Sequence, residues 1–120
     1  MIVLTIPECT PSLNKLLGQH WAHKHATRNR WRWLVKAACL EAKVFERPNY
    51  PRARITVERT GGRLLDCDNA FSGLKFLLDA LKHEGFIEDD DPPHIGQPEL
   101  RQIIDKKLRR TVVKIEGVGI

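Results

Sequence analysis

The residues best suited to chemistry are aspartates that cluster in the second half of the chain. Asp66 and Asp68 stand two residues apart, and Asp89, Asp90 and Asp91 follow one another directly further along. An extended backbone aims side chains at this two-residue spacing to the same side. Paired carboxylate oxygens are the ligands that Mg²⁺ and Mn²⁺ prefer. We therefore expect a divalent-metal site that includes Asp66 and Asp68 and is completed by a carboxylate of the later run.

A lysine accompanies these carboxylates. If residues 68–85 form one helix, four polar side chains lie within about 60° of one another on its surface: Asp68, Ser72, Lys75 and Asp79. Hydrolysis of a phosphodiester requires a deprotonated water and neutralisation of the charge that develops in the transition state. A carboxylate-bound metal can provide both, and the ammonium of Lys75 is placed to stabilise the developing charge.

Each of these residues also has a purely structural interpretation. Asp68 is a good N-cap residue, and residues 89–91 suit a solvated turn. Lys75 and Asp79 have the i,i+4 spacing of an exposed ion pair. The joint occurrence favours the chemical interpretation, because a basic protein gains nothing obvious from concentrating its aspartates.

The net charge of +5 is unevenly distributed. Six of the fifteen acidic residues fall in one stretch, and without them the balance would be twenty basic residues against nine acidic ones: Asp66, Asp68, Asp79, Asp89, Asp90 and Asp91. A cationic body of this kind attracts polyanions such as nucleic acid. The candidate DNA contacts are basic residues in and around a predicted helix, together with one arginine before the first aspartate: Lys24, Arg28, Arg32, Lys36 and Arg63.

Hydrophobic periodicity predicts the elements that must position these residues. Strands are expected over residues 2–6, 52–60 and 111–116, where β-branched or alternating patterns occur. Helices are expected over residues 27–47 and 68–85, the first from an apolar stripe of three- and four-residue spacing, the second between good terminal residues. Trp31 falls on the stripe and is expected in the core.

The remaining segments are expected to be loops or stay undecided. Residues 7–26 show no sustained period and predict a long loop, and residues 89–98 predict a second one. Residues 99–107 suit a helix turn as well as an irregular strand. The order β-α-β-α-β-β predicts an α/β (α+β) fold, with a small mixed sheet of about four strands and two main helices, in a single domain over residues 1–120.

The chain has the pattern of a cytoplasmic protein. No apolar run is long enough for a signal-peptide core or a membrane span. The three cysteines, Cys9, Cys39 and Cys67, have the spacing of neither a disulfide framework nor a zinc ribbon, which favours a reducing compartment. We expect Cys67 to point away from the neighbouring aspartates, into the sheet. Trp21 is a candidate for stacking on an exposed base.

Three stretches together resemble a known family. They are DCDN at residues 66–69, KFLLDAL at 75–81 and GFIEDD at 85–90, preceded by PSLN at 11–14, which follows the first strand. This combination resembles the RusA family of Holliday-junction resolvases, found in bacteria and their phages. The matching order of elements extends along nearly the whole chain.

The resemblance implies an α/β homodimer that cuts four-way DNA junctions in recombination and repair, with Mg²⁺ (or Mn²⁺) as cofactor. It assigns catalytic roles to Asp66, Asp68, Asp90 and Lys75, and metal ligation to Asp66, Asp68, Asp89 and Asp90. A homodimer also has a physical rationale, because a junction of approximate two-fold symmetry must be nicked in two opposed strands.

Two alternatives remain open at this level. One is a metal-dependent nuclease that acts on other branched DNA or on RNA. The other is a member of the same fold that binds branched DNA without cutting it. The feature that favours this second alternative is Lys75, which stands three residues further from Asn69 than in the related sequence pattern, a shift of nearly one helical turn.

Overall fold

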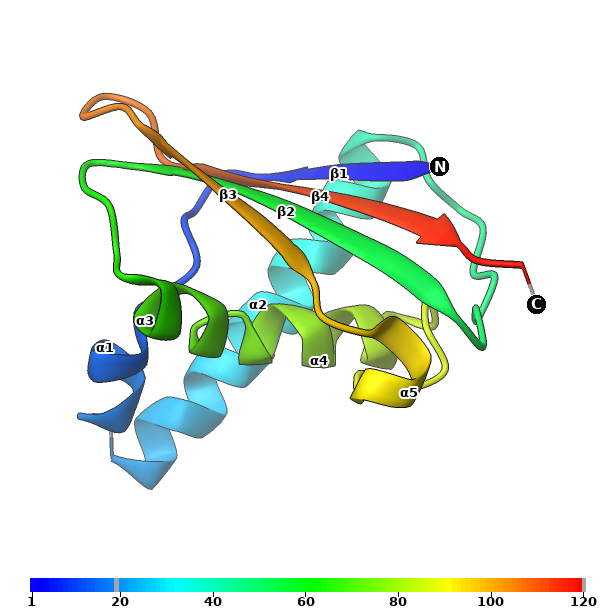
Figure 1. The fold of residues 1–120 in the computed structure, drawn as a ribbon, viewed down its shortest axis with the longest axis horizontal. Helices are drawn as coiled ribbons and strands as arrows, with labels where there is room; N and C mark the ends of the chain where they lie inside the picture. The colour runs from blue at the N-terminus through cyan, green and yellow to red at the C-terminus, as the bar shows by residue number, and fades with distance from the viewer. Residues whose placement is uncertain (19, 120) are drawn as a thin grey trace.

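In three of the four strands of the sheet, buried residues alternate with more exposed ones along most of the strand. In the computed structural model, which describes residues 1–18 and 20–119, the strands are β1 (Ile2–Ile6), β2 (Ala53–Gly61), β3 (Glu99–Ile104) and β4 (Arg110–Gly117). The helices lie against one face of the sheet (Figure 1). Alternation is what a sheet requires when one face packs on a core and the other meets solvent.

The four strands form one mixed sheet in the order β1-β4-β2-β3. β4 pairs antiparallel with both β1 and β2, and β3 pairs parallel with β2. The register aligns buried side chains in rows across the sheet, as where Leu4 opposes Val113 and Val113 opposes Val57. These rows form the sheet's side of the core.

Two main helices supply the other side of the core. α2 (Trp21–Glu41) buries Trp31, Val35, Ala38 and Cys39, and α4 (Lys75–Glu84) buries Phe76, Leu77, Ala80 and Leu81. α4 ends at Gly85, whose φ of 94° is a conformation that glycine adopts without strain. The predicted fold class, a small mixed sheet with two main helices, is confirmed, and so is the burial of Trp31. No helix in the described part of the chain is both long enough and apolar enough to cross a bilayer.

The long loop predicted over residues 7–26 is wrong in part. It contains α1 (Leu13–Leu17), and α2 begins at Trp21 rather than near residue 27. The start of α1 has a serine cap that the prediction missed, because Oγ of Ser12 accepts a hydrogen bond from the backbone N–H of Lys15 at 3.1 Å. His20, at the N-cap of α2, makes no such bond. Residue 19 and the side chain of Asn14 lie outside the described residues.

Three other boundaries also differ from the prediction. α2 ends at Glu41, not near residue 47, so Phe45 is exposed instead of lying on the apolar stripe. The loop predicted over residues 89–98 contains the short helix α5 (Pro92–Ile95). The undecided segment forms β3, because its backbone pairs with the edge of β2.

The helix predicted over residues 68–85 is divided into two. α3 (Cys67–Ser72) ends at Gly73, and α4 starts at Lys75. At the break the backbone of Gly73 lies so close to the carbonyl of Pro11 that a Cβ atom would overlap it. Because of this interruption, Asp68 and Ser72 belong to α3, whereas Lys75 and Asp79 belong to α4.

We expect Gly73→Ala to destabilise the protein by about 1–3 kcal/mol, because the added methyl group meets backbone that cannot rotate away as a side chain can. Denaturant unfolding measures the effect. The control is Gly62→Ala, where a Cβ would meet nothing within 4 Å. If both variants were as stable as each other, the close packing of Gly73 against the Pro11 backbone would not be a constraint on the fold.

Candidate functional site

Two of the predicted catalytic residues, Lys75 and Asp90, line one pocket of about 210 Å³. We call it the Lys75 pocket. Its other lining residues come from α2 and α4: Trp21, Lys24, His25, Arg28, Phe76 and Asp79. The structure therefore brings together two predicted catalytic residues and two predicted DNA contacts, Lys24 and Arg28.

The break before α4 sets the position of Lys75. The lysine is the first residue of α4 and is exposed, while the next residue, Phe76, is buried and anchors the helix start. One turn later, Asp79 accepts a hydrogen bond from Nε of Arg32 at 3.0 Å. In the described part of the chain no ion pair joins Asp79 to Lys75. The ammonium of Lys75 therefore faces the pocket without the partner that helix spacing suggested.

The predicted DNA contacts divide among different surroundings. Arg32 is held by Asp79. Lys36, one turn further along α2, is exposed. Arg63 lines a separate and larger cleft of about 690 Å³, which has no lining residue in common with the Lys75 pocket. Of the five predicted contacts, Lys24 and Arg28 therefore line the Lys75 pocket, Arg63 lines the larger cleft, and the other two line neither cavity.

The carboxylates of Asp89 and Asp90 are in unlike electrostatic surroundings. Asp89 accepts the backbone N–H of Asp90 at 2.8 Å and pairs with Lys82 at 3.1 Å, and these contacts lower its pKa. The pKa of Asp90 is raised, first by burial and then by its hydrogen bond with Asp89. The same Asp89 carboxylate holds the pKa of Lys82 above its ordinary value. The surroundings of Asp90 therefore favour the protonated form of its carboxyl group over the ionised form.

A third carboxylate in this loop has a histidine partner. Asp91, at the N-cap of α5, bonds Nδ1 of His94, and this contact raises the pKa of His94. Asp89, Asp91 and His94 have potential ligand atoms within 4.8 Å of one another. Sequence reasoning missed His94, although its three-residue spacing from Asp91 is that of neighbours on a helix.

Asp66 and Asp68 lie elsewhere in the described structure. Asp66 is at the N-cap of α3 and accepts a hydrogen bond from the side-chain amide of Asn69; Asp68 is in the first turn. Both are exposed. Among the described residues they line no part of the Lys75 pocket and belong to no cluster of three potential metal ligands. The four aspartates predicted to bind the metal are therefore not gathered into one group.

The expectation for Cys67 is wrong. Cys67 is exposed rather than turned into the sheet. The expectation assumed extended backbone, in which neighbouring side chains alternate between faces, but Cys67 is the first residue of α3.

Trp21 lies at the edge of the Lys75 pocket and is 79% exposed. Its ring stacks on His25 with centroids 5.6 Å apart, and Nδ1 of His25 lies 2.9 Å from Nη2 of Arg28. An exposed aromatic surface next to cationic side chains is the combination that binds unpaired bases and their phosphates.

No protein-family model and no curated protein matches the chain. The resemblance to the RusA family therefore rests on the motif residues quoted above.

At about pH 7 and without divalent cations, we expect Asp90→Asn to raise the midpoint of thermal unfolding. The raised pKa means that ionised Asp90 costs folding free energy, which a neutral amide of the same shape avoids. Since the folded state has the higher pKa, the wild type regains this stability as the pH falls through the folded and then the unfolded value. Melts at about pH 3 should therefore show a smaller difference.

The control for this measurement is Asp89→Asn. Its pKa is lowered in the folded state, so its ionised form stabilises the protein, and that contribution is lost as the pH falls. The substitution should lower the midpoint at neutral pH. A lower midpoint for Asp90→Asn as well would contradict the assignment of Asp90 as the strained carboxylate.

Proposed function

We propose that the protein is a metal-dependent, structure-selective DNA endonuclease that resolves four-way junctions as a homodimer, acting in recombination and repair in the cytoplasm. The observation that carries the proposal is the Lys75 pocket, where two motif residues distant in sequence line one cavity with Lys24 and Arg28. The described cysteines are all free, which suits a reducing compartment.

The donor chemistry supports a hard divalent cation. Asp66, Asp68, Asp89 and Asp90 offer only carboxylate oxygens, which suit Mg²⁺ or Mn²⁺. The raised pKa of Asp90 beside Asp89 adds to this fit, because a cation relieves the repulsion between two carboxylates. The Asp89, Asp91 and His94 cluster fits less well, since imidazole suits zinc or copper better. When bound, the ion would supply an activated water and neutralise phosphate charge.

The chain's own residues would perform the other steps. The exposed ammonium of Lys75 would stabilise the negative charge that grows on the phosphate as the bond to the 3′ oxygen breaks. Lys24 and Arg28 would bind phosphates flanking the cleaved one, and Trp21 would stack on a base freed at the junction. The phosphate- and base-binding side chains come from α2 and Lys75 comes from α4, and the hydrophobic core packs these two helices together.

A second candidate function is binding of branched DNA without cleavage. The observation that favours it is the position of Asp66 and Asp68, which in the described structure lie outside the Lys75 pocket. Under this alternative the cations still bind phosphates, and the carboxylates are structural.

A cleavage assay on a synthetic four-way junction separates these candidates. With Mg²⁺ or Mn²⁺ we expect paired, symmetric nicks that are absent with linear duplex and with Asp68→Asn. Lys75→Gln should lower the cleavage rate by about 10²-fold, because it removes one charge that stabilises the transition state. Lys114→Gln is the matched control: it removes an exposed lysine on the solvent face of β4 and should leave the rate unchanged.

The outcomes are distinct. Tight junction binding with no nicks from any variant would identify a non-catalytic binding module. Equal cutting of forked DNA or of structured RNA would identify a nuclease of broader substrate range. Equal loss of rate in Lys75→Gln and Lys114→Gln would show that Lys75 acts only through net charge.

An exposed apolar stripe supports the homodimer. Trp33, Ala37 and Leu40 follow at four- and three-residue spacing on α2 and all are exposed, Trp33 at 67% and Leu40 at 63%. Residues at this spacing share one helix face. A second copy of α2 is the partner that this face would bury in a symmetric dimer.

We expect Trp33→Lys to convert the dimer to a monomer and to uncouple the two nicks, because the charge would be buried in an apolar interface. Analytical ultracentrifugation measures the mass, and the ratio of paired to single nicks measures the coupling. Phe45→Lys is the control, as Phe45 is 71% exposed but lies beyond the end of α2. A wild type that sediments as a monomer would contradict the dimer.

A further inference from the structure

The cleft that Arg63 lines is larger than the Lys75 pocket and shares none of its lining residues. Its volume of about 690 Å³ is within the range of ligand sites. It is lined by one carboxylate, Glu8, and by six cationic side chains: Lys15, Arg30, Arg59, Arg63, Lys106 and Arg109. We call it the basic cleft. Side chains of one sign that gather in a concave surface concentrate the electrostatic potential there.

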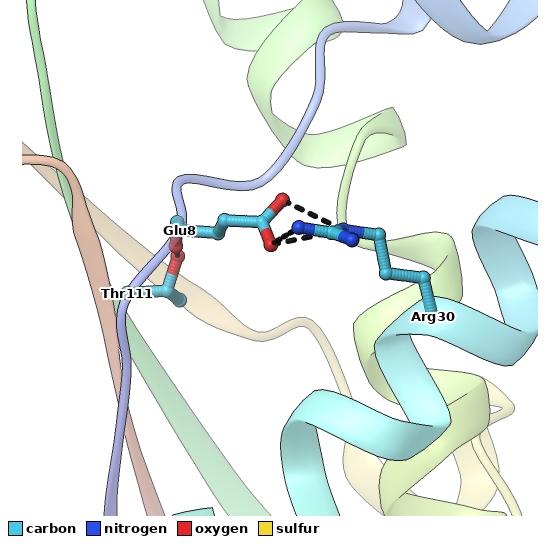
Figure 2. A network of polar contacts seen from close by, with 3 residues as sticks. All are labelled: Glu8, Arg30 and Thr111. Atoms are coloured by element: carbon cyan, nitrogen blue, oxygen red, sulfur yellow. Dashed lines mark hydrogen bonds and ion pairs between the residues drawn. The ribbon is translucent and has the colours of Figure 1, made fainter.

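One wall of the basic cleft is held in place by polar contacts (Figure 2). The hydroxyl of Thr111 on β4 donates to the backbone oxygen of Glu8 at 2.7 Å. The Glu8 carboxylate accepts from the guanidinium of Arg30 on α2, with Nε at 2.9 Å and 3.2 Å from its two oxygens. The segment after β1 is thus tied to both the sheet and α2, and the acidic residue of the cleft is already neutralised. A preformed wall lowers the ordering cost of binding.

Arg59 is a buried cation at this cleft. It is 8% exposed, and its guanidinium donates to the backbone oxygens of Thr10 at 2.9 Å and Arg63 at 3.4 Å. Both partners are neutral, and among the described residues no carboxylate forms an ion pair with Arg59. A buried charge without a counter-charge costs folding free energy. An anion bound in the cleft would supply that counter-charge and stabilise the Arg59 guanidinium.

Thr10 gives a second and independent indication. It lines the cleft, is 1% exposed, and its Oγ1 has no hydrogen-bond partner within the described residues. Buried polar groups are nearly always paired, so the hydroxyl of Thr10, on a residue that lines the cleft, is available to a ligand bound there. The unpaired hydroxyl belongs to the same residue whose backbone oxygen binds Arg59.

We propose that the basic cleft binds a phosphate group, carried by a DNA strand that passes outside the Lys75 pocket. Arg59 provides the buried charge and the Thr10 hydroxyl a hydrogen bond to a phosphate oxygen. The choice of DNA as the source rests on the proposed function. Phosphate fits the site because it is an anion with several acceptor oxygens, and arginine binds such groups through more than one N–H.

The first test removes the unpaired hydroxyl. Thr10→Val keeps the side-chain shape and should weaken binding of a labelled four-way junction about tenfold, measured by anisotropy without divalent cations. Because the hydroxyl has no partner in the protein, the unfolding midpoint should not fall. Thr60→Val is the matched control: Thr60 is 2% exposed with an equally unpaired hydroxyl, but lies outside the cleft lining. Wild-type affinity in Thr10→Val would overturn the proposal.

The second test uses exposed charges, which do not endanger folding. Arg63→Gln and Arg109→Gln should each reduce by about one the slope of log affinity against log salt concentration, as expected when one phosphate contact is lost. Both residues line the cleft and are exposed. An unchanged slope in both variants would overturn the proposal.

Pyrophosphate is the probe that tests whether the cleft binds a phosphate group of a small molecule rather than of DNA. If pyrophosphate binding depends on Thr10 while junction binding does not, the phosphate site stands and its assignment to DNA is wrong. The proposed nuclease function fails separately. If junction binding depends on the cleft but no cleavage occurs in Mg²⁺ or Mn²⁺, the phosphate site is supported and the nuclease function is contradicted. If all cleft variants bind and cleave normally, the nuclease function is supported and the phosphate site is contradicted.

Discussion

The close approach of Gly73 to the carbonyl of Pro11 is the constraint on which both cavities depend. It lies at the junction between α3 and α4, two residues before Lys75, which begins α4 and lines the pocket formed with α2. The same approach holds the segment after β1 against α3. That segment carries Thr10, whose backbone oxygen accepts from Arg59. A side chain at position 73 would separate these elements, since backbone atoms at van der Waals contact cannot give way.

The protein keeps two unfavourable electrostatic arrangements in its folded state. Asp90 is a half-buried carboxyl group pressed against a second carboxylate, and Arg59 is a buried cation whose partners are only carbonyl oxygens. Arrangements of this kind lower stability and are typical of sites that meet a ligand of opposite charge. The first would be relieved by a divalent cation and the second by a phosphate. Under the proposed function, one DNA substrate and its metal ion would therefore stabilise both regions.

Much of the fold could be predicted because it follows from local patterns. β-branched or alternating patterns identified β1, β2 and β4 to within one residue at each end, and apolar spacing placed Trp31 in the core. β3 was undecided because none of its residues is buried and its strand conformation depends on pairing with β2. α1 was missed because it is short, and the break between α3 and α4 because αR backbone continues through Gly73 and Leu74.

By itself the sequence determined the types of chemistry available: which residues carry oxygen ligands, that cations surround them, and that two helices cover a mixed sheet. Only the tertiary structure decided which of them meet. It placed Lys75 and Asp90 with Lys24 and Arg28, left Asp66 and Asp68 outside that pocket, and joined Thr10 to Arg59. The physical reason is range: propensity and periodicity act over a few residues, whereas the meeting of distant side chains depends on how whole elements pack.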